Sequence, residues 1–195
     1  MGINRLNSKG GDGVAEIEER ELIRKLKKGN EDAYIYLLDI YGSRLLKTCY
    51  LVLKDEKEAE DVVQETFLRV FSHINSFRGN SSLYTWVYRI ALNLCKDKRK
   101  TIREFEIYED IIESKERVED VVFNSIDREI LRKELFNLNS IYKEILILFY
   151  FEELSIKEIS QILEEKEGTI KSRLSRGRLI LKDAIERGGD LYGQG

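Results

Sequence analysis

The chain has 195 residues, of which 42% are hydrophobic and 35% are charged, and its formal net charge is −3. It contains no proline and is dominated by leucine, isoleucine, glutamate and lysine, which favours an all-α protein over a turn-rich β architecture. No run of about 18 apolar residues is present to span a membrane, and residues 1–13 lack the apolar core of a signal peptide. A cytoplasmic location is therefore expected, with Cys49 and Cys95 as free thiols.

Hydrophobic periodicity divides the chain into two helical domains joined by an acidic flexible linker. The expected order is a disordered tail at 1–15, a first domain at 16–103, the linker at 104–125, a second domain at 126–187 and a disordered tail at 188–195. Residues 104–120 include eight acidic and two basic residues, and their apolar residues are too sparse for a buried helix.

Capping residues mark the helix ends of the first domain. Gly29 ends one helix, and Asn30 caps the next, which continues to about Leu53. Asp55 starts a third helix, with Glu58 in the position of a capping box. Apolar residues with a 3.6-residue period predict a buried stripe on this helix: Ala59, Val62, Val63, Phe67, Val70, Phe71 and Ile74. Its opposite face is polar: Glu60, Asp61, Gln64, Glu65 and Arg69.

A fourth helix follows a loop at residues 75–82 and ends in a basic run at residues 96–100. Its apolar residues predict a second buried stripe: Leu83, Trp86, Val87, Ile90, Ala91 and Leu94. We therefore expect Trp86 to belong to the core of the first domain.

The second domain is predicted to contain four helices. Two strongly apolar helices cover about residues 127–138 and 140–152, and Ser155 with Glu158 forms a capping box that opens a short third helix. A turn at residues 164–167 leads to the last helix. Two short helices separated by a tight turn are typical of a helix-turn-helix domain.

The last helix has two contrasting faces. Its apolar face is expected to pack on the domain: Ile170, Leu174, Gly177, Leu181 and Ala184. Between Thr169 and Lys182 there are five basic residues and no acidic residue, in a chain that is acidic overall. Long cationic side chains and hydroxyls suit the major groove of DNA, although a solvated basic helix is the simpler alternative.

The helix-turn-helix segment resembles region four of the extracytoplasmic-function (group IV) sigma factors of the sigma-70 family. The resemblance is carried by LSIKEI at residues 154–159 and GTIKSRLSRGR at residues 168–178, whereas Glu164 stands where this family commonly has glycine. In that family this region binds the minus-thirty-five promoter element. The implied DNA-binding residues are Thr169, Lys171, Ser172, Ser175, Arg176, Arg178 and Lys182.

The resemblance extends into the first domain. EAEDVVQETF at residues 58–67 is similar to the region-two helix that binds the coiled-coil clamp of the largest polymerase subunit, although an ordinary amphipathic helix would show the same pattern. The implied polymerase-binding residues are Glu58, Asp61, Gln64, Glu65, Phe67 and Arg69. The segment FRG at 77–79 and the helix after it resemble the part that captures the melted minus-ten strand. The implied strand-binding residues are Phe77, Leu83, Tyr84, Asn93, Lys96, Arg99 and Lys100.

The resemblance implies a sigma factor, which binds core RNA polymerase through the beta and beta-prime subunits and directs it to promoter DNA. An anti-sigma factor is an expected further partner. No catalytic residue, cofactor, metal or small-molecule substrate is implied, and the linker is either a channel-threading segment or a simple tether. The alternative is a helix-turn-helix regulator that binds operators without polymerase, which would have no use for the predicted clamp-binding and strand-binding residues.

Overall fold

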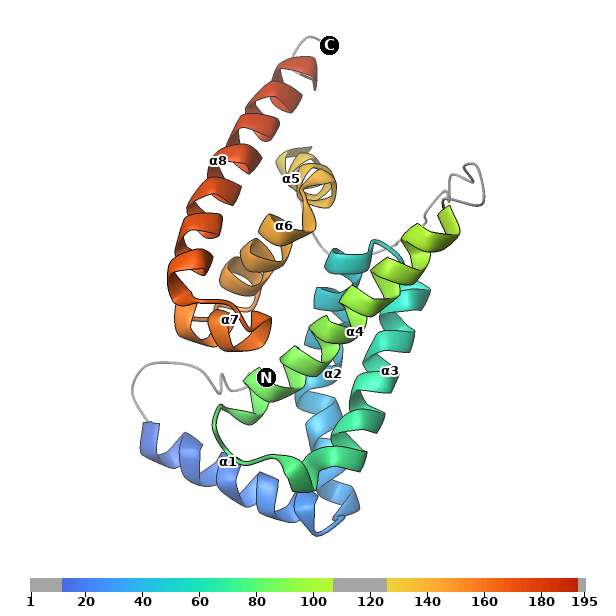
Figure 1. Ribbon diagram of the computed structural model, residues 1–195, viewed down its shortest axis with the longest axis vertical. Coiled ribbons are helices and arrows are strands. Elements are labelled where there is room, and N and C mark those ends of the chain that lie inside the picture. The colour runs from blue at the N-terminus through green and yellow to red at the C-terminus, as the bar shows by residue number, and fades with distance from the viewer. Residues whose placement is uncertain (1–11, 107–125, 193–195) are drawn as a thin grey trace.

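The computed structural model describes residues 12–106 and 126–192, and every regular element in these ranges is helical (Figure 1). The amino-terminal unit consists of α1 Asp12–Lys27, α2 Glu31–Leu53, α3 Glu56–His73, the 3-10 turn η1 Ile74–Ser76 and α4 Leu83–Glu106. The carboxy-terminal unit consists of α5 Ile126–Asn137, α6 Ser140–Leu146, the π-helical segment η2 Ile147–Phe151, α7 Ile156–Leu163 and α8 Glu167–Tyr192. The predicted all-α class is confirmed, while most of the predicted linker, 107–125, lies outside the described residues.

Three helices extend beyond the limits expected from the sequence. The first begins at Asp12, the fourth continues to Glu106, and the last continues to Tyr192. Helix growth adds one hydrogen bond for each residue fixed, and without proline no residue sterically stops these helices. Among the described helices, none combines the length and the apolar character needed to cross a membrane.

The caps of the amino-terminal unit agree in part with the sequence analysis. The side chain of Asn30 accepts a hydrogen bond from the Ala33 amide at 2.9 Å, as expected for the start of α2. Asp55 likewise caps α3 by accepting from the Glu58 amide at 2.8 Å. The Glu58 carboxylate lies 2.5 Å from the Lys98 Nζ of α4, so this side chain links two helices.

The buried stripe of α3 agrees with the predicted one except at Phe71, and it also includes Thr66. Its buried residues are Ala59, Val62, Thr66 and Val70. The Thr66 hydroxyl donates to the Val62 carbonyl at 2.7 Å, so a polar residue is buried without an unpaired donor. The expectation that Phe71 is buried was wrong, because this residue is 59% exposed; its ring packs against the Tyr34 ring, with centroids 4.7 Å apart.

The helix-turn-helix prediction is confirmed by the local geometry of α7 and α8. Ser155 and Glu158 form the complete capping box at the start of α7. Glu164 ends this helix in a left-handed conformation, with φ 56°. Ile159 and Ile162 on α7 and Ile170 and Leu174 on α8 are all buried. At position 164, glutamate thus occupies the left-handed conformation that glycine, unlike most other residues, adopts without strain.

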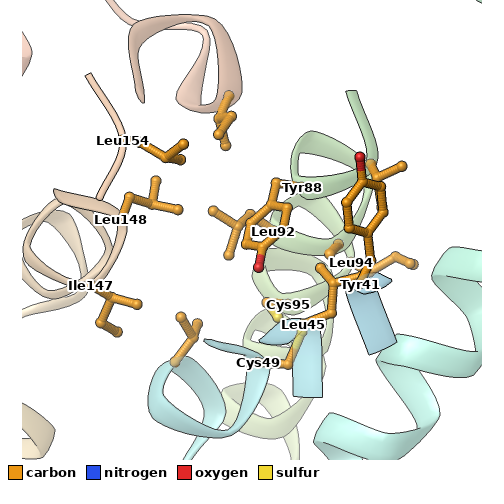
Figure 2. Packing of buried hydrophobic residues seen from close by; sticks show 14 of the residues in the cluster. Tyr41, Leu45, Cys49, Tyr88, Leu92, Leu94, Cys95, Ile147, Leu148 and Leu154 are labelled. Carbon is orange, nitrogen blue, oxygen red and sulfur yellow. The ribbon is translucent and has the colours of Figure 1, made fainter. Parts of the chain in front are cut away.

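The two units share one continuous apolar core. Helix α4 packs against α2 and α3 and also against α7, which Figure 1 shows beside its amino-terminal half. Figure 2 shows Tyr88 and Leu92 of α4 facing Leu148 and Leu154 of the carboxy-terminal unit, and all four are buried. Cys49 and Cys95 are free and buried within the amino-terminal unit.

Gly177 allows α8 to approach α6 closely. A Cβ atom at this position would lie 3.2 Å from the Tyr142 Cβ and 3.5 Å from the Leu146 Cδ1. Gly168, in the first turn of α8, has open space where its Cβ would be. The two glycines therefore differ in packing although both belong to one helix.

We predict that Gly177→Val lowers the free energy of unfolding by about 1–3 kcal/mol, because the added methyl groups must displace α6. Gly168→Val is the matched control and should change stability by less than about 0.5 kcal/mol. Urea denaturation monitored by circular dichroism measures both values. Equal effects of the two substitutions would mean that helix propensity, and not the α6 contact, determines the result.

Candidate polymerase and nucleic-acid interfaces

The polymerase-binding candidates on α3 fall into exposed and packed groups. Asp61, Gln64 and Arg69 are exposed, whereas Phe67 packs partly against the core. Glu65 forms a surface ion pair with Arg69 at 2.8 Å. The sixth candidate, Glu58, is half-buried in its contact with Lys98. The pairing with Glu58 raises the pKa of Lys98, which therefore remains cationic beside this acidic face.

The sequence analysis missed two apolar members of this surface. Leu68 is 62% exposed and Phe71 is 59% exposed. With Asp61 and Gln64 they recur at spacings of three and four residues, and we call these four residues the α3 face. Phe71 lies on the apolar stripe that the sequence predicts, so periodicity alone does not place it at the surface; the position of the neighbouring helices does.

The minus-ten candidates do not form a single exposed surface. Phe77 is 5% exposed, and Leu83 is fully buried at the start of α4. The Phe77 ring contacts the half-buried Trp86, with centroids 5.2 Å apart, and its carbonyl accepts from Lys27 Nζ at 2.8 Å. The Leu83 amide donates to the Glu19 carboxylate at 3.0 Å. These contacts anchor the loop and the first turn of α4.

The remaining minus-ten candidates lie along α4. Asn93, Lys96 and Lys100 are exposed and line a cavity of about 300 Å³ between α4 and the carboxy-terminal unit. Arg99 pairs with Glu144 of α6. The Tyr84 hydroxyl donates to Glu152 of the carboxy-terminal unit at 2.5 Å. In this conformation the second unit therefore covers part of the predicted strand-binding surface.

The minus-thirty-five candidates share the outer face of α8. Thr169 is half-buried and the other six candidates are exposed: Lys171, Ser172, Ser175, Arg176, Arg178 and Lys182. The Arg178 guanidinium lies 5.1 Å from the centroid of the Phe149 ring, and Lys182 forms an exposed ion pair with Glu186 at 3.6 Å. Arg173, between these residues, pairs with Glu165 at 3.0 Å and lies at the edge of the face. The result is a basic face available to a polyanion.

A buried lysine lies where α6 meets the amino-terminal unit. Lys143 is 5% exposed, and burial together with the nearby charges of Lys54 and Arg99 lowers the pKa of Lys143 to about 8. The adjacent Glu144 acts in the opposite direction but does not compensate. The charged ammonium group of Lys143 therefore opposes the packing of the two units at neutral pH.

Two family models match the chain: Sigma-70 region 2 over residues 37–104 and Sigma-70 region 4 over residues 128–181. The chain is 33% identical over 183 residues to the ECF RNA polymerase sigma factor SigW of Bacillus subtilis, covering 87% of this chain and 98% of the relative. It is 35% identical to the ECF RNA polymerase sigma factor SigM of the same organism, covering 79% and 93% of the two chains.

A solved structure has a similar fold. It is the sigma factor RpoE from Bartonella quintana in a co-crystal structure with the anti-sigma factor NepR. The TM-score is 0.68 at 25% sequence identity, and the similarity covers 78% of this chain and 96% of that one. A second solved structure, of CnrH in complex with the cytosolic domain of CnrY, has the same fold, with a TM-score of 0.66 at 20% sequence identity over 87% of this chain and 97% of that one.

We predict that Lys143→Met raises the free energy of unfolding at pH 7 by about 2 kcal/mol, because it removes a buried charge and keeps an apolar stem. In the parent chain, the folded state releases the Lys143 proton near pH 8, while the unfolded state keeps it to about pH 10. Stability should therefore rise between these pH values, and Lys143→Met should flatten that rise. The measurement is a series of urea denaturations from pH 7 to pH 10. Lys166→Met, at an exposed position, is the control. If the free energy of unfolding of Lys143→Met rose with pH as steeply as in the parent chain, the prediction would be contradicted.

Proposed function

We propose that three separate surfaces carry the function of this chain, which belongs to the extracytoplasmic-function RNA polymerase sigma factors of the sigma-70 family. Members of this family direct transcription initiation, and this chain does so through regions 2 and 4. The α3 face binds core polymerase, α4 binds the minus-ten strand, and the outer face of α8 binds the minus-thirty-five duplex. The observation that best supports this division is the outer face of α8, which is basic and exposed while the opposite face is buried. The family is non-enzymatic, so the chain acts by binding.

The outer face of α8 has the properties of a recognition helix. Its amino-terminal half carries Lys171, Ser172, Ser175 and Arg176, and α7 with its capped start holds it at a fixed angle. The hydroxyls and the guanidinium are able to bond base edges. Lys182 lies about 1.7 to 3 turns further along α8, and we assign it to the phosphate backbone. We assign sequence discrimination to the first half of α8 and general affinity to the second.

The α3 face combines two kinds of attraction. Asp61 and Gln64 offer acceptors to a basic partner, and Leu68 and Phe71 offer exposed apolar area to its aliphatic stems. A mixed surface of this kind fits a charged, partly apolar helix pair such as the clamp of the largest polymerase subunit. The exposed apolar residues distinguish it from an ordinary solvated helix face.

For the minus-ten strand we propose a smaller set of residues than the sequence indicates. Asn93, Lys96 and Lys100 are exposed and supply amide and cationic groups to bases and phosphates. Tyr84 and Arg99 join them only when their contacts with region 4 are released. Phe77 and Leu83, being buried, support the loop and do not stack on bases.

The partners follow from the family and from one relative. RNA polymerase binding is implied by the family, and we propose that it takes place in the cytoplasm, where the chromosome is transcribed. RpoE of Bartonella quintana is bound to an anti-sigma factor in its structure, and its fold is similar to this one. We propose that an anti-sigma factor also binds this chain.

The direct test is transcription in vitro with purified core polymerase and genomic DNA, followed by mapping of the start sites. We expect transcripts that begin downstream of a shared pair of promoter elements and that require the chain. Specific binding to operator DNA without any polymerase-dependent transcript would contradict the proposal and indicate a regulator that acts alone.

We predict that Leu68→Ser weakens the affinity for core polymerase by about tenfold or more, because a central apolar contact is replaced by a hydroxyl. Tyr36→Ser is the control, because Tyr36 is also an exposed apolar residue but lies outside the α3 face. Tyr34 of α2 contacts Phe71 of that face, and Tyr36 points about 160° away from Tyr34 around the helix axis. Fluorescence titration of labelled chain with core polymerase gives both affinities. Equal losses in the two variants, or none in Leu68→Ser, would exclude the α3 face.

We predict that Arg176→Ala and Lys182→Ala weaken DNA binding in different ways. A side chain bonded to a base edge discriminates by about 1–3 kcal/mol at one base pair, whereas a phosphate contact weakens all sequences alike. Arg176→Ala should therefore relax the preference at one minus-thirty-five position, and Lys182→Ala should lower binding evenly and flatten its salt dependence. Competition between promoter variants at two salt concentrations measures this. Even loss across all variants for Arg176→Ala would make Arg176 a phosphate contact.

A further inference from the structure

A carboxylate of region 4 is buried in a socket built by region 2. Glu152 follows the π-helical segment η2 and is 4% exposed. Four region-2 side chains donate hydrogen bonds to its two oxygens: Thr48 at 2.5 Å, Tyr84 at 2.5 Å, Tyr88 at 2.9 Å and Arg44 at 3.2 Å. We call these four donors the carboxylate socket.

The chemistry of the socket matches one carboxylate. The two oxygens of a carboxylate accept up to about four hydrogen bonds, and the socket supplies four donor side chains. Arg44 also lies 3.0 Å from the same carboxylate through Nη2, so one cation faces one anion. Burial and the Glu152 charge raise the pKa of Tyr84 and Tyr88, which therefore stay protonated and continue to donate.

The local backbone of region 4 presents Glu152 to the socket. The amide of Glu152 donates to the Ile147 carbonyl at 3.2 Å, which closes the wide turn of η2. The next residue, Glu153, has φ 54°, and the Leu154 amide then returns to the Leu148 carbonyl at 3.1 Å. This turn directs Glu152 out of its own domain and toward α2 and α4, while Glu153 remains exposed.

Two further ion pairs join α4 to region 4, and one of them involves Arg99 of the proposed minus-ten surface. Arg99 is paired with Glu144 of α6, and Arg89 lies 3.7 Å from Glu164 at the end of α7. The apolar contact seen in Figure 2 lies between the same elements. Tyr84 and Arg99 are thus engaged by region 4 as long as Glu152 occupies the socket.

We propose that Arg44, Thr48, Tyr84 and Tyr88 form a carboxylate-binding site on region 2 that Glu152 fills within the same chain, holding region 4 over the minus-ten surface. The site favours a carboxylate because Arg44 supplies a cation and all four side chains donate to the same group. Strand capture then requires Glu152 to leave, since Tyr84 cannot serve both partners. This last consequence rests on the proposed function of α4, whereas the site itself does not.

The test separates opening of the two regions from DNA binding, and it uses the full chain. Glu152→Gln keeps the size of the side chain but removes the charge that faces Arg44 and replaces one acceptor oxygen with an amide NH₂. Glu153→Gln is the same change one residue away at an exposed position. Labels are attached through Lys57→Cys on α3 and Lys157→Cys on α7, both exposed, because the native cysteines are buried.

The first measurement is the distance between the labels by pulsed electron paramagnetic resonance. We expect one short distance in the parent chain and in Glu153→Gln, and a longer, broader distribution in Glu152→Gln. Thr48→Val, which removes one donor from the region-2 side, should give an intermediate distribution. An unchanged distance in Glu152→Gln, with circular dichroism showing a folded chain, would overturn the proposal.

The second measurement is the affinity for a fluorescein-labelled, random-sequence single-stranded DNA of about 12 nucleotides. Release of Tyr84 and Arg99 should raise the affinity of Glu152→Gln about five- to tenfold over Glu153→Gln. A longer label distance without this gain would uphold the socket and would remove Tyr84 from the proposed minus-ten surface. A gain in affinity at an unchanged distance would overturn the socket as the element that holds region 4.

Discussion

Helix α4 is the element on which both halves of the molecule depend. One side of it completes the core with α2 and α3, through buried residues such as Val87 and Ala91. Another side carries Tyr88 and Leu92 toward the carboxy-terminal unit, where they face Leu148 and Leu154 in the same buried cluster (Figure 2). A helix buried along two sides has only a narrow stripe left for other partners.

This constraint determines which of the three proposed surfaces are free. The outer face of α8 and the α3 face point away from the contact between the units, and most of their residues are exposed. The α4 surface differs, because Tyr84 and Arg99 are held by Glu152 and Glu144. Region 4 therefore presents its duplex-binding face while it restricts the strand-binding face of region 2.

Opposing electrostatic contributions meet at the contact between the two regions. The Glu152 carboxylate is matched by a guanidinium and three hydroxyls, which offsets the cost of burying its charge. Lys143 lies where α6 meets region 2, and its burial, together with the charges of Lys54 and Arg99, lowers its pKa, which reports a cost to the charged form. The contact between the two regions thus combines a carboxylate with four hydrogen-bond donors and a lysine whose charged form burial disfavours.

The sequence by itself determined the helical class, the cap at Asn30, the capping box at Ser155 and the two faces of α8. These features depend on neighbours within about four residues, so the local pattern contains them. Only the tertiary structure decided that Glu152 leaves its own domain, because its partner Arg44 is 108 residues away in sequence. The sequence assigned Leu83 both to the buried stripe and to the strand-binding residues, and the tertiary structure decided that Leu83 is core and that Phe71 is surface. Periodicity predicts that a helix has an apolar side, but the position of the neighbouring helices fixes which residues on that side are covered.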